Sequence, residues 1–369
     1  SLGGTVYIKS DLYPRYTYGD ELRVSCGLEK PEPVEEFRYD MYLANMGVFT
    51  VCQTPYIEKI GSKKGSPLLQ GIFSFKSLIA KKIELLWHEP YASFMAGLLY
   101  GYRGGLGSLQ ELFATTGVTH IIAISGYNIT LIATLLISCC TALSIPRKKA
   151  FVLVVATIGV FVIFAGASAS VVRAGIMGII VLFATRMGRK SSVAPVMMVT
   201  AACMALANPF VVVWDAGFQL SFLATLGLVY LSPHIEKKFV RLPNLLGLKE
   251  TLIATCSAIL ATLPLILYQF GRLSVVAPVV NILILWALPW IMMLGFFAVV
   301  CSFIFLPFGT VIAWLAFAGM KYIVVVVTWF AHLRFASVDM HIPWWMMCVG
   351  YISMIGYVWK KSRVRGDAL

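Results

Sequence analysis

The chain has 369 residues, of which 59% are hydrophobic and 13% charged, with a mean hydropathy of +0.83. This composition excludes an ordinary soluble globular protein and indicates a membrane protein with several spans. The net charge of +13 is unevenly distributed: residues 1–69 contain eight Lys/Arg and nine Asp/Glu, a net of −1, whereas residues 70–369 contain 22 and eight, a net of +14. The first 69 residues therefore differ in kind from the rest.

The N-terminal segment, residues 1–66, contains short β-branched and aromatic runs that Gly, Pro and Asp interrupt. This pattern is typical of small antiparallel strands, and we expect part of an all-β barrel module here. The chain opens on Ser1 in mid-strand, without the basic and apolar regions of a signal peptide. We therefore expect further sequence upstream.

A helical segment is expected over residues 67–104. In "LLQGIFSFKSLIAKKIELLW" the apolar residues recur at helical spacing, with lysines between them. This pattern suits a helix that lies in the membrane interface, and it suits an amphipathic helix of a soluble module equally well.

Residues 105–361 contain nine apolar segments, so the predicted fold class is mainly α, a polytopic transmembrane helical bundle. The expected spans cover residues 117–139, 150–166, 168–185, 193–212, 214–231, 250–268, 274–305, 310–331 and 342–359. The seventh is longer than the roughly 20 residues that cross a bilayer, and it contains Pro278 and Pro289. We expect it to tilt strongly or to break into two pieces.

Basic clusters predict the orientation of the bundle, because short loops rich in Lys/Arg stay in the cytoplasm. Clusters at 146–149, 186–190, 236–249 and 360–365 are separated by even numbers of expected spans, so all four can be cytoplasmic together. The basic tail, residues 362–369, is then cytoplasmic as well. The N-terminal module and the loops at 166–169, 208–213, 269–273 and 332–341 face outward.

The eight cysteines divide between the two parts of the chain. Cys26 and Cys52 belong to the outward-facing module, where oxidising conditions favour a disulfide between them. The other six lie in or beside apolar spans, where burial explains them. No Cys or His spacing typical of a metal site is present, so we expect no metal and no other cofactor.

Polar residues inside apolar spans are candidates for function, because a polar or ionisable group is costly there. Under the predicted orientation those inside the spans fall in the outer half of the membrane, and Arg272 flanks the seventh span on the same side. The candidates are His120, Ser125, Gly126, Asn128, Arg173, Asp215, Gln219, Arg272 and Asn281.

Purely structural explanations stand beside each candidate. Arg173 could extend to the interface, Asp215 could cap a helix, and the two could form an ion pair that fastens two helices. His120 could be a packed histidine, and the Ser125-Gly126 pair could be a small-residue packing patch.

A break at Ser125-Gly126 would free backbone N–H groups, and a half-helix N-terminus near Arg173 would favour an anion such as a phosphate. The set therefore predicts a pathway for an anionic substrate. Two alternatives stay open. A transporter for a small anion would show repeated halves, which the sequence lacks, and an intramembrane serine protease would use Ser125 with His332 or His341 as base.

Four stretches resemble, in order, the motifs of the competence domain of the ComEC DNA-internalisation proteins. They are "SLQELFATTGVTHIIAISGYNITLIA" (108–133), "SASVVRAGIMGII" (168–180), "DAGFQLSFLATLGLVYLSP" (215–233) and "LPLILYQFGRLSVVAPVVNILILWALP" (263–289). The family has Leu-His after "AISG" where this chain has Tyr127-Asn128, so no role of that histidine is carried over. Residues 1–66 resemble the later part of the OB-fold-like extracellular module of these proteins.

The resemblance implies a multi-pass protein of the bacterial inner membrane that takes up single-stranded DNA during natural transformation. By motif match, the implied elements of the DNA path are His120, Ser125, Gly126, Arg173, Asp215, Gln219, Ser221 and Asn281. An OB-like module would capture the strand by aromatic stacking, for which Tyr7, Tyr13, Tyr16 and Tyr18 are available.

The resemblance also implies partners. These are single-stranded DNA, the lipid bilayer, an extracytoplasmic DNA receptor and a cytoplasmic ATPase or helicase. Many relatives end with a metallo-β-lactamase-like domain, which this sequence does not contain, so we expect no enzymatic activity from it.

Overall fold

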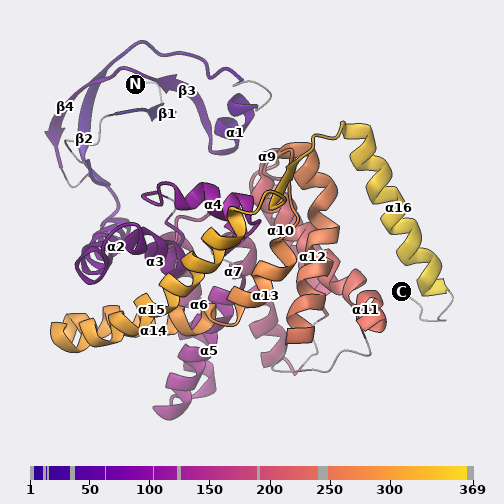
Figure 1. Cartoon of the computed structure of the whole chain (residues 1–369). Helices are drawn as coiled ribbons and strands as arrows, with labels where there is room; N and C mark the ends of the chain where they lie inside the picture. The colour runs from indigo at the N-terminus through magenta and orange to yellow at the C-terminus, as the bar shows by residue number, and fades with distance from the viewer. Residues whose placement is uncertain are drawn as a thin grey trace.

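A β-containing head lies over a helical body (Figure 1). The computed structural model describes residues 4–10, 14, 16–33, 38–62, 64–102, 104–122, 126–188, 192–239 and 248–363. Most of the described residues are helical, as the composition predicts, and the head and body meet where helix α1 of the head reaches α9 of the body.

The head contains four strands and one helix. These are β1 (Thr5–Ile8), β2 (Glu21–Ser25), α1 (Tyr39–Asn45), β3 (Val48–Cys52) and β4 (Tyr56–Gly61). β1 pairs with β3 in parallel and β2 pairs with β4 antiparallel, as two separate sheets. The pairing of β2 with β4 agrees with the expected antiparallel strands, whereas the parallel pair β1–β3 and the helix α1 depart from an all-β, antiparallel module. The OB-like barrel stays a prediction.

Helix α1 covers the apolar face of β3 in the head. Leu43 of α1 packs with Val48 and Val51 of β3 in a small core. A disulfide joins Cys26, just after β2, to Cys52 at the end of β3, with Cα atoms 6.1 Å apart. The disulfide thus links the end of β3 to the segment that follows β2, which Glu29 also joins to Val51 of β3 through two backbone hydrogen bonds.

An ion pair fixes the turn before β2. The Lys59 ammonium lies 2.7 Å from a carboxylate oxygen of Asp20, whose other oxygen accepts the Thr17 amide at 2.9 Å. These contacts, the Lys59 bond first, lower the pKa of Asp20 below its ordinary 3.8.

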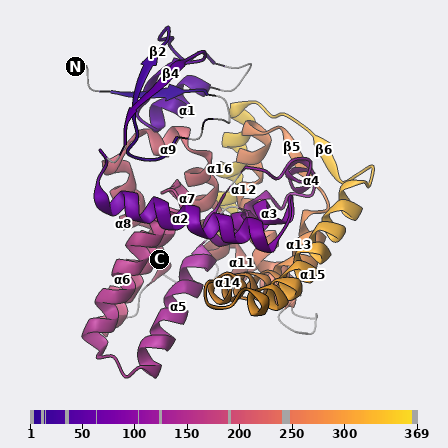
Figure 2. The same ribbon diagram turned by 90° about the vertical axis from the view of Figure 1, so that its left-hand side faces the viewer.

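Three helices form a layer between the head and the bundle: α2 (Pro67–Leu86), α3 (Tyr91–Tyr100) and α4 (Leu109–Thr115). Proline opens α2, where its missing N–H costs nothing, and Gly101 ends α3 in the left-handed region. Figure 2 shows α2 lying across the body beneath the head, as an interfacial helix would. The 3₁₀ turn η1 (Thr119–Ile121) follows α4.

The bundle contains a helix within each of the nine expected spans. In chain order the helices are α5 (Gly126–Ala142), α6 (Arg147–Phe164), α7 (Ala169–Arg186), α8 (Val193–Ala207), α9 (Phe210–Trp214), α10 (Ala216–Leu226), the π-turn η2 (Gly227–Leu231), α11 (Ser232–Glu236), the 3₁₀ turn η3 (Lys237–Phe239), α12 (Leu248–Gln269), α13 (Ala277–Leu285), α14 (Leu288–Ile304), α15 (Leu306–Ala331) and α16 (Trp344–Arg363). The short strands β5 (Arg272–Ser274) and β6 (Ser337–Asp339) pair antiparallel.

Four helical stretches among the described residues are long and apolar enough to cross a membrane, and a fifth is added if a bent pair counts as one span. The four are Ala169–Arg186, Ala216–Glu236, Lys249–Gln269 and Leu306–Ala331. The bent pair is α13 and α14, at 46° to each other, with Pro289 in the first turn of α14. The predicted break in the seventh segment is therefore confirmed, whereas the count of nine spans stays a prediction.

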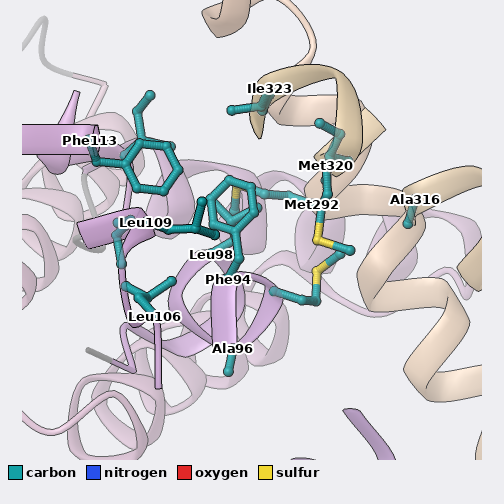
Figure 3. Packing of buried hydrophobic residues seen from close by; sticks show 14 of the residues in the cluster. Phe94, Ala96, Leu98, Leu106, Leu109, Phe113, Met292, Ala316, Met320 and Ile323 are labelled. Carbon is teal, nitrogen blue, oxygen red and sulfur yellow. The ribbon is translucent and has the colours of Figure 1, made fainter. Parts of the chain in front are cut away.

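The largest apolar core lies where α3 and α4 meet α13, α14 and α15 (Figure 3). Phe94 and Phe113 are fully buried there, with ring centroids 5.3 Å apart, and Met292 and Met320 fill the space toward α14 and α15. This packing joins the layer to the C-terminal half of the bundle.

Candidate functional site

The start of α5 faces α7 beside the candidate Arg173. Ser125 lies outside the described residues, and Gly126 is the first residue of α5. A Cβ atom at Gly126 would lie 3.8 Å from the Cβ of Ala174, the neighbour of Arg173. The first N–H groups of a helix have no partner within that helix, so this end of α5 presents donors near the arginine.

Arg173 crosses from α7 to α10. Its Nη1 donates to the carbonyl of Ser221 at 2.6 Å and to the hydroxyl of Thr225 at 2.8 Å, and its guanidinium carbon lies 5.7 Å from the ring centroid of Phe222. We call Arg173, Ser221, Phe222 and Thr225 the arginine cluster. The side chain therefore points into the bundle and does not extend to an interface.

All partners of Arg173 in the arginine cluster are neutral. Among the described residues no carboxylate lies within ion-pair distance of it, so the proposed pair with Asp215 is not formed. Among the residues that the structure describes, the buried Nε of Arg173 and the buried hydroxyl of Ser221 have no hydrogen-bond partner. A positive charge with a free donor is suited to an anionic oxygen.

Asp215 acts as the N-cap of α10, the structural alternative raised for it. One carboxylate oxygen accepts the amide of Phe218 at 2.8 Å. The other accepts the Asn45 side-chain amide of the head at 3.3 Å, and Asn208 donates to the Asn45 carbonyl at 2.7 Å. Asp215 therefore both starts a helix and fastens the head to the bundle.

Arg38 strengthens this joint. Its guanidinium carbon lies 5.5 Å from the ring centroid of Trp214, the last residue of α9. We call Arg38, Asn45, Asn208, Trp214 and Asp215 the head joint.

Gln219 connects three helices. Its amide nitrogen donates to the carbonyls of Val212 and Val213, at 3.0 and 2.9 Å, and its carbonyl oxygen accepts from Gln269 of α12 at 2.6 Å. Both ends of the side-chain amide are thus satisfied within the bundle, and the residue holds α9, α10 and α12 in place.

The two asparagines differ. Asn128 is buried and donates to the carbonyl of Leu98 at 3.1 Å, which ties α5 to α3. Asn281 of α13 is also buried, and its side-chain oxygen has no partner among the described residues. Asn281 is therefore the second place in the bundle with an unused buried polar atom.

His120 and Arg272 belong to η1 and β5, and among the described residues they form no hydrogen bond or ion pair with the arginine cluster. His120 is exposed in η1, and the turn before it packs on the start of α13, since a Cβ at Gly117 would lie 2.8 Å from the Cβ atoms of Ser274 and Ala277. Gly117 has φ +70°, which favours glycine. Arg272 forms a 3.1 Å ion pair with Asp339, across β5 and β6.

The candidates therefore form two groups. Gly126, Asn128, Arg173, Asp215, Gln219 and Ser221 belong to the packed helices α5, α7 and α10 or to the cap of α10, whereas His120, Arg272 and Asn281 belong to η1, β5 and α13. The sequence reasoning missed Thr225, Asn45, Asn208 and Gln269. Thr225 follows Ser221 by four residues on one helix face and could have been found, but no sequence signal links Asn45 to residues more than 160 positions away.

Ser125, the nucleophile of the protease alternative, lies outside the described residues, so its geometry with His332 and His341 is not described. His332 follows α15, and its Nδ1 lies 2.7 Å from the carbonyl of Thr328. No group of three His, Cys, Asp or Glu side chains suited to a metal occurs within the described ranges.

A family model described as "Competence protein" matches residues 98–364. ComE operon protein 3 of Bacillus subtilis (strain 168) is 31% identical to this chain over 167 residues, which are 45% of this chain and 21% of that protein. The matched stretch thus covers about a fifth of the curated relative. No solved structure matches this chain.

Proposed function

This chain belongs to the competence protein family, and on that basis we propose that it forms the channel through which single-stranded DNA crosses the bacterial inner membrane during natural transformation. The matched model covers all of the bundle, including both groups of candidate residues. Uptake of DNA by a membrane protein requires a route for a chain of phosphates through an apolar layer.

The observation that carries the proposal is the arginine cluster. Arg173 keeps a buried charge inside an apolar bundle with only neutral partners among the described residues, and neither its Nε nor the hydroxyl of Ser221, whose carbonyl it binds, has a hydrogen-bond partner there. A buried charge of this kind costs free energy, and a phosphate oxygen that accepts from the free Nε would offset part of that cost. The start of α5 at Gly126 adds the positive end of a helix nearby.

The head supplies aromatic rings for the bases. Tyr7 is 43% exposed and Tyr56 is 74% exposed, and each has a face on which a base can stack. Of the predicted stacking residues, Tyr18 is exposed but packs on Phe73 of α2, Tyr16 is half-buried, and Tyr13 lies outside the described residues.

The predicted orientation is part of the proposal. The pairing of β5 with β6 puts the ends of α12 and α15 on one side of the bundle, and the head joint puts the head at the same end of α10 as Asp215. These contacts fix only which parts lie at the same end of the bundle; the outward head and the cytoplasmic C-terminus are proposed from the basic clusters in the loops. The extracytoplasmic receptor and the cytoplasmic ATPase or helicase are proposed partners, and no catalytic role is proposed for this chain.

Arg173→Ala tests the proposal in a transformable cell whose DNA uptake depends on this chain. Internalisation of labelled DNA should fall by at least about tenfold, because the route loses its charged donor. Arg173→Lys should retain part of the activity, since it keeps the charge without the fork of donors.

Arg186→Ala is the matched control, because Arg186 ends the same helix and lies over the ring of Phe151 at 4.6 Å. This variant should take up DNA normally. Wild-type uptake by Arg173→Ala, at equal levels of protein in the membrane, would refute the assignment of the arginine cluster to the path.

A further inference from the structure

Helices α14 and α15 form a hairpin whose turn is a single residue, Phe305. Small residues bring the two helices together. A Cβ at Gly309 would lie 2.8 Å from the backbone of Ser302, and one at Gly319 would lie 2.5 Å from Ile291. Two such positions, ten residues apart on α15, fix an antiparallel pair that behaves as one unit.

The hairpin lies across the bundle. Figure 1 shows α14 and α15 running mainly sideways, whereas α5 points toward the bottom and α12 runs from top to bottom. In Figure 2, which is turned by 90°, the hairpin points toward the viewer and α5 and α6 extend below it.

Contacts of the hairpin with α2, and with Trp87 just beyond α2, show at what level along the bundle the tip of the hairpin lies. Lys82 donates to the carbonyl of Ser302 at 3.1 Å, and Trp87 donates to the carbonyl of Ala313 at 3.1 Å. On the same helix, Lys76 lies 5.8 Å from the ring centroid of Phe164, the last residue of α6. Six residues of helix advance only about 9 Å, so the tip lies near the level of that end of α6.

The position of the tip near the Phe164 end of α6 conflicts with a hairpin in which α14 and α15 each cross the whole membrane. Under the nine-span topology the turn at Phe305 would share the cytoplasmic face with the α5–α6 turn. That turn is separated from Phe164 by the whole of α6, whose 18 residues span about 27 Å. The segments that flank α13, α14 and α15 also stay together, because β5 before α13 pairs with β6 after α15.

The sequence of the hairpin agrees with the geometry. Residues 273–320 contain no Asp, Glu, Lys or Arg, so the turn at Phe305 lacks the basic residues of a cytoplasmic loop. The side chains around it are exposed and apolar: Ile304 (85%), Phe305 (61%), Phe308 (57%) and Trp314 (72%). Such a surface, with its backbone bonded in helices, matches hydrocarbon and would be costly in water.

We infer that α14 and α15 form a re-entrant hairpin that enters the bilayer from the side of the head, contacts lipid chains at its tip and returns without reaching the opposite face. The partner of the exposed surface is the acyl region of the membrane. Lys82 of α2 donates to the Ser302 carbonyl near the C-terminal end of α14, and it caps this helix end at the border of the acyl region. The chain then has two crossings fewer than its apolar segments predict.

The test uses the full chain with its six free cysteines replaced and the Cys26–Cys52 disulfide kept. Single cysteines are introduced by Ile304→Cys and, as a second tip position, by Phe308→Cys. Leu143→Cys in the α5–α6 turn and Phe335→Cys between α15 and β6 are matched exposed controls for the two faces. A membrane-impermeant maleimide is applied from each side, and a bimane label is read in vesicles with nitroxide-labelled acyl chains.

The two controls should label from opposite faces. Both tip cysteines should resist the impermeant reagent from either side, and acyl-chain nitroxides should quench their bimane fluorescence. Labelling of the tip from the same side as Leu143→Cys would overturn the inference, because the hairpin would then cross completely. Tip cysteines that are unquenched but cross-link between two copies of the chain would overturn the lipid contact in favour of a dimer surface.

Discussion

Replacing Asp215 separates its two structural roles. Asp215→Ala removes the cap of α10, worth about 1 kcal/mol, and the hydrogen bond from Asn45. A bond to a charged group contributes about 1.5–3 kcal/mol at good geometry, and at 3.3 Å we take about 1 kcal/mol. The loss of about 2 kcal/mol corresponds to an approximately thirtyfold increase in local opening.

Hydrogen exchange of the first turn of α10 measures this opening. In the full chain in lipid nanodiscs, peptides over residues 216–222 should exchange about thirtyfold faster in Asp215→Ala. Asp215→Asn keeps an oxygen for the amide of Phe218 but turns an NH₂ group toward Asn45, so it should lose only the joint, about fivefold. Asn45→Ala should match Asp215→Asn, and the two changes together should cost little more than either alone.

Unchanged exchange in Asp215→Ala would refute the capping role. A different result would reassign the residue: if Asp215→Asn exchanges like the wild type but no longer takes up DNA, its carboxylate acts in the path and not in the joint.

Two further predictions concern the stability of the core and of the head. Phe94→Ala should lower the free energy of unfolding by about 3–5 kcal/mol, because it empties the fully buried position beside Phe113. The control Phe296→Ala, on the exposed face of α14, should change this free energy little. Thermal unfolding in nanodiscs compares the two variants, and equal losses of stability would contradict the core assignment. The pKa of Asp20 is lower in the folded head than the ordinary 3.8, so the ionised carboxylate stabilises the fold above about pH 4 and this stabilisation is lost as the pH falls through the lowered value. Asp20→Asn should therefore unfold at a lower temperature than the wild type at neutral pH, and the difference should shrink below pH 4; a constant difference would show that Lys59 does not act on the charge.

The sequence predicted what depends on local patterns. Apolar runs located the helices of the bundle, Pro289 marked the break before α14, and a helix cap was one of the roles considered for Asp215. Each of these follows from residues within one or two turns of each other.

Features that depend on distant contacts were not predictable in the same way. Apolar length shows that a helix can cross a bilayer but not in which direction it runs, so the count of nine spans stays a prediction for α14 and α15. The uncharged turn at Phe305 is a local sign in favour of the re-entrant hairpin that we propose. The neutral partners of Arg173 come from the register of α7 against α10, which packing alone decides.

The head joint bears on how the chain can be divided. A boundary at residue 66 looks natural, since charge and secondary structure both change there. Excising the head, however, would remove the partners that Asn45 provides to Asp215 and Asn208, and it would uncover Trp214 where Arg38 now lies. The helical bundle therefore depends on the head for part of its structure. In a fragment without the head, the first turn of α10 would be weakened, and α10 is the helix that provides the partners of Arg173.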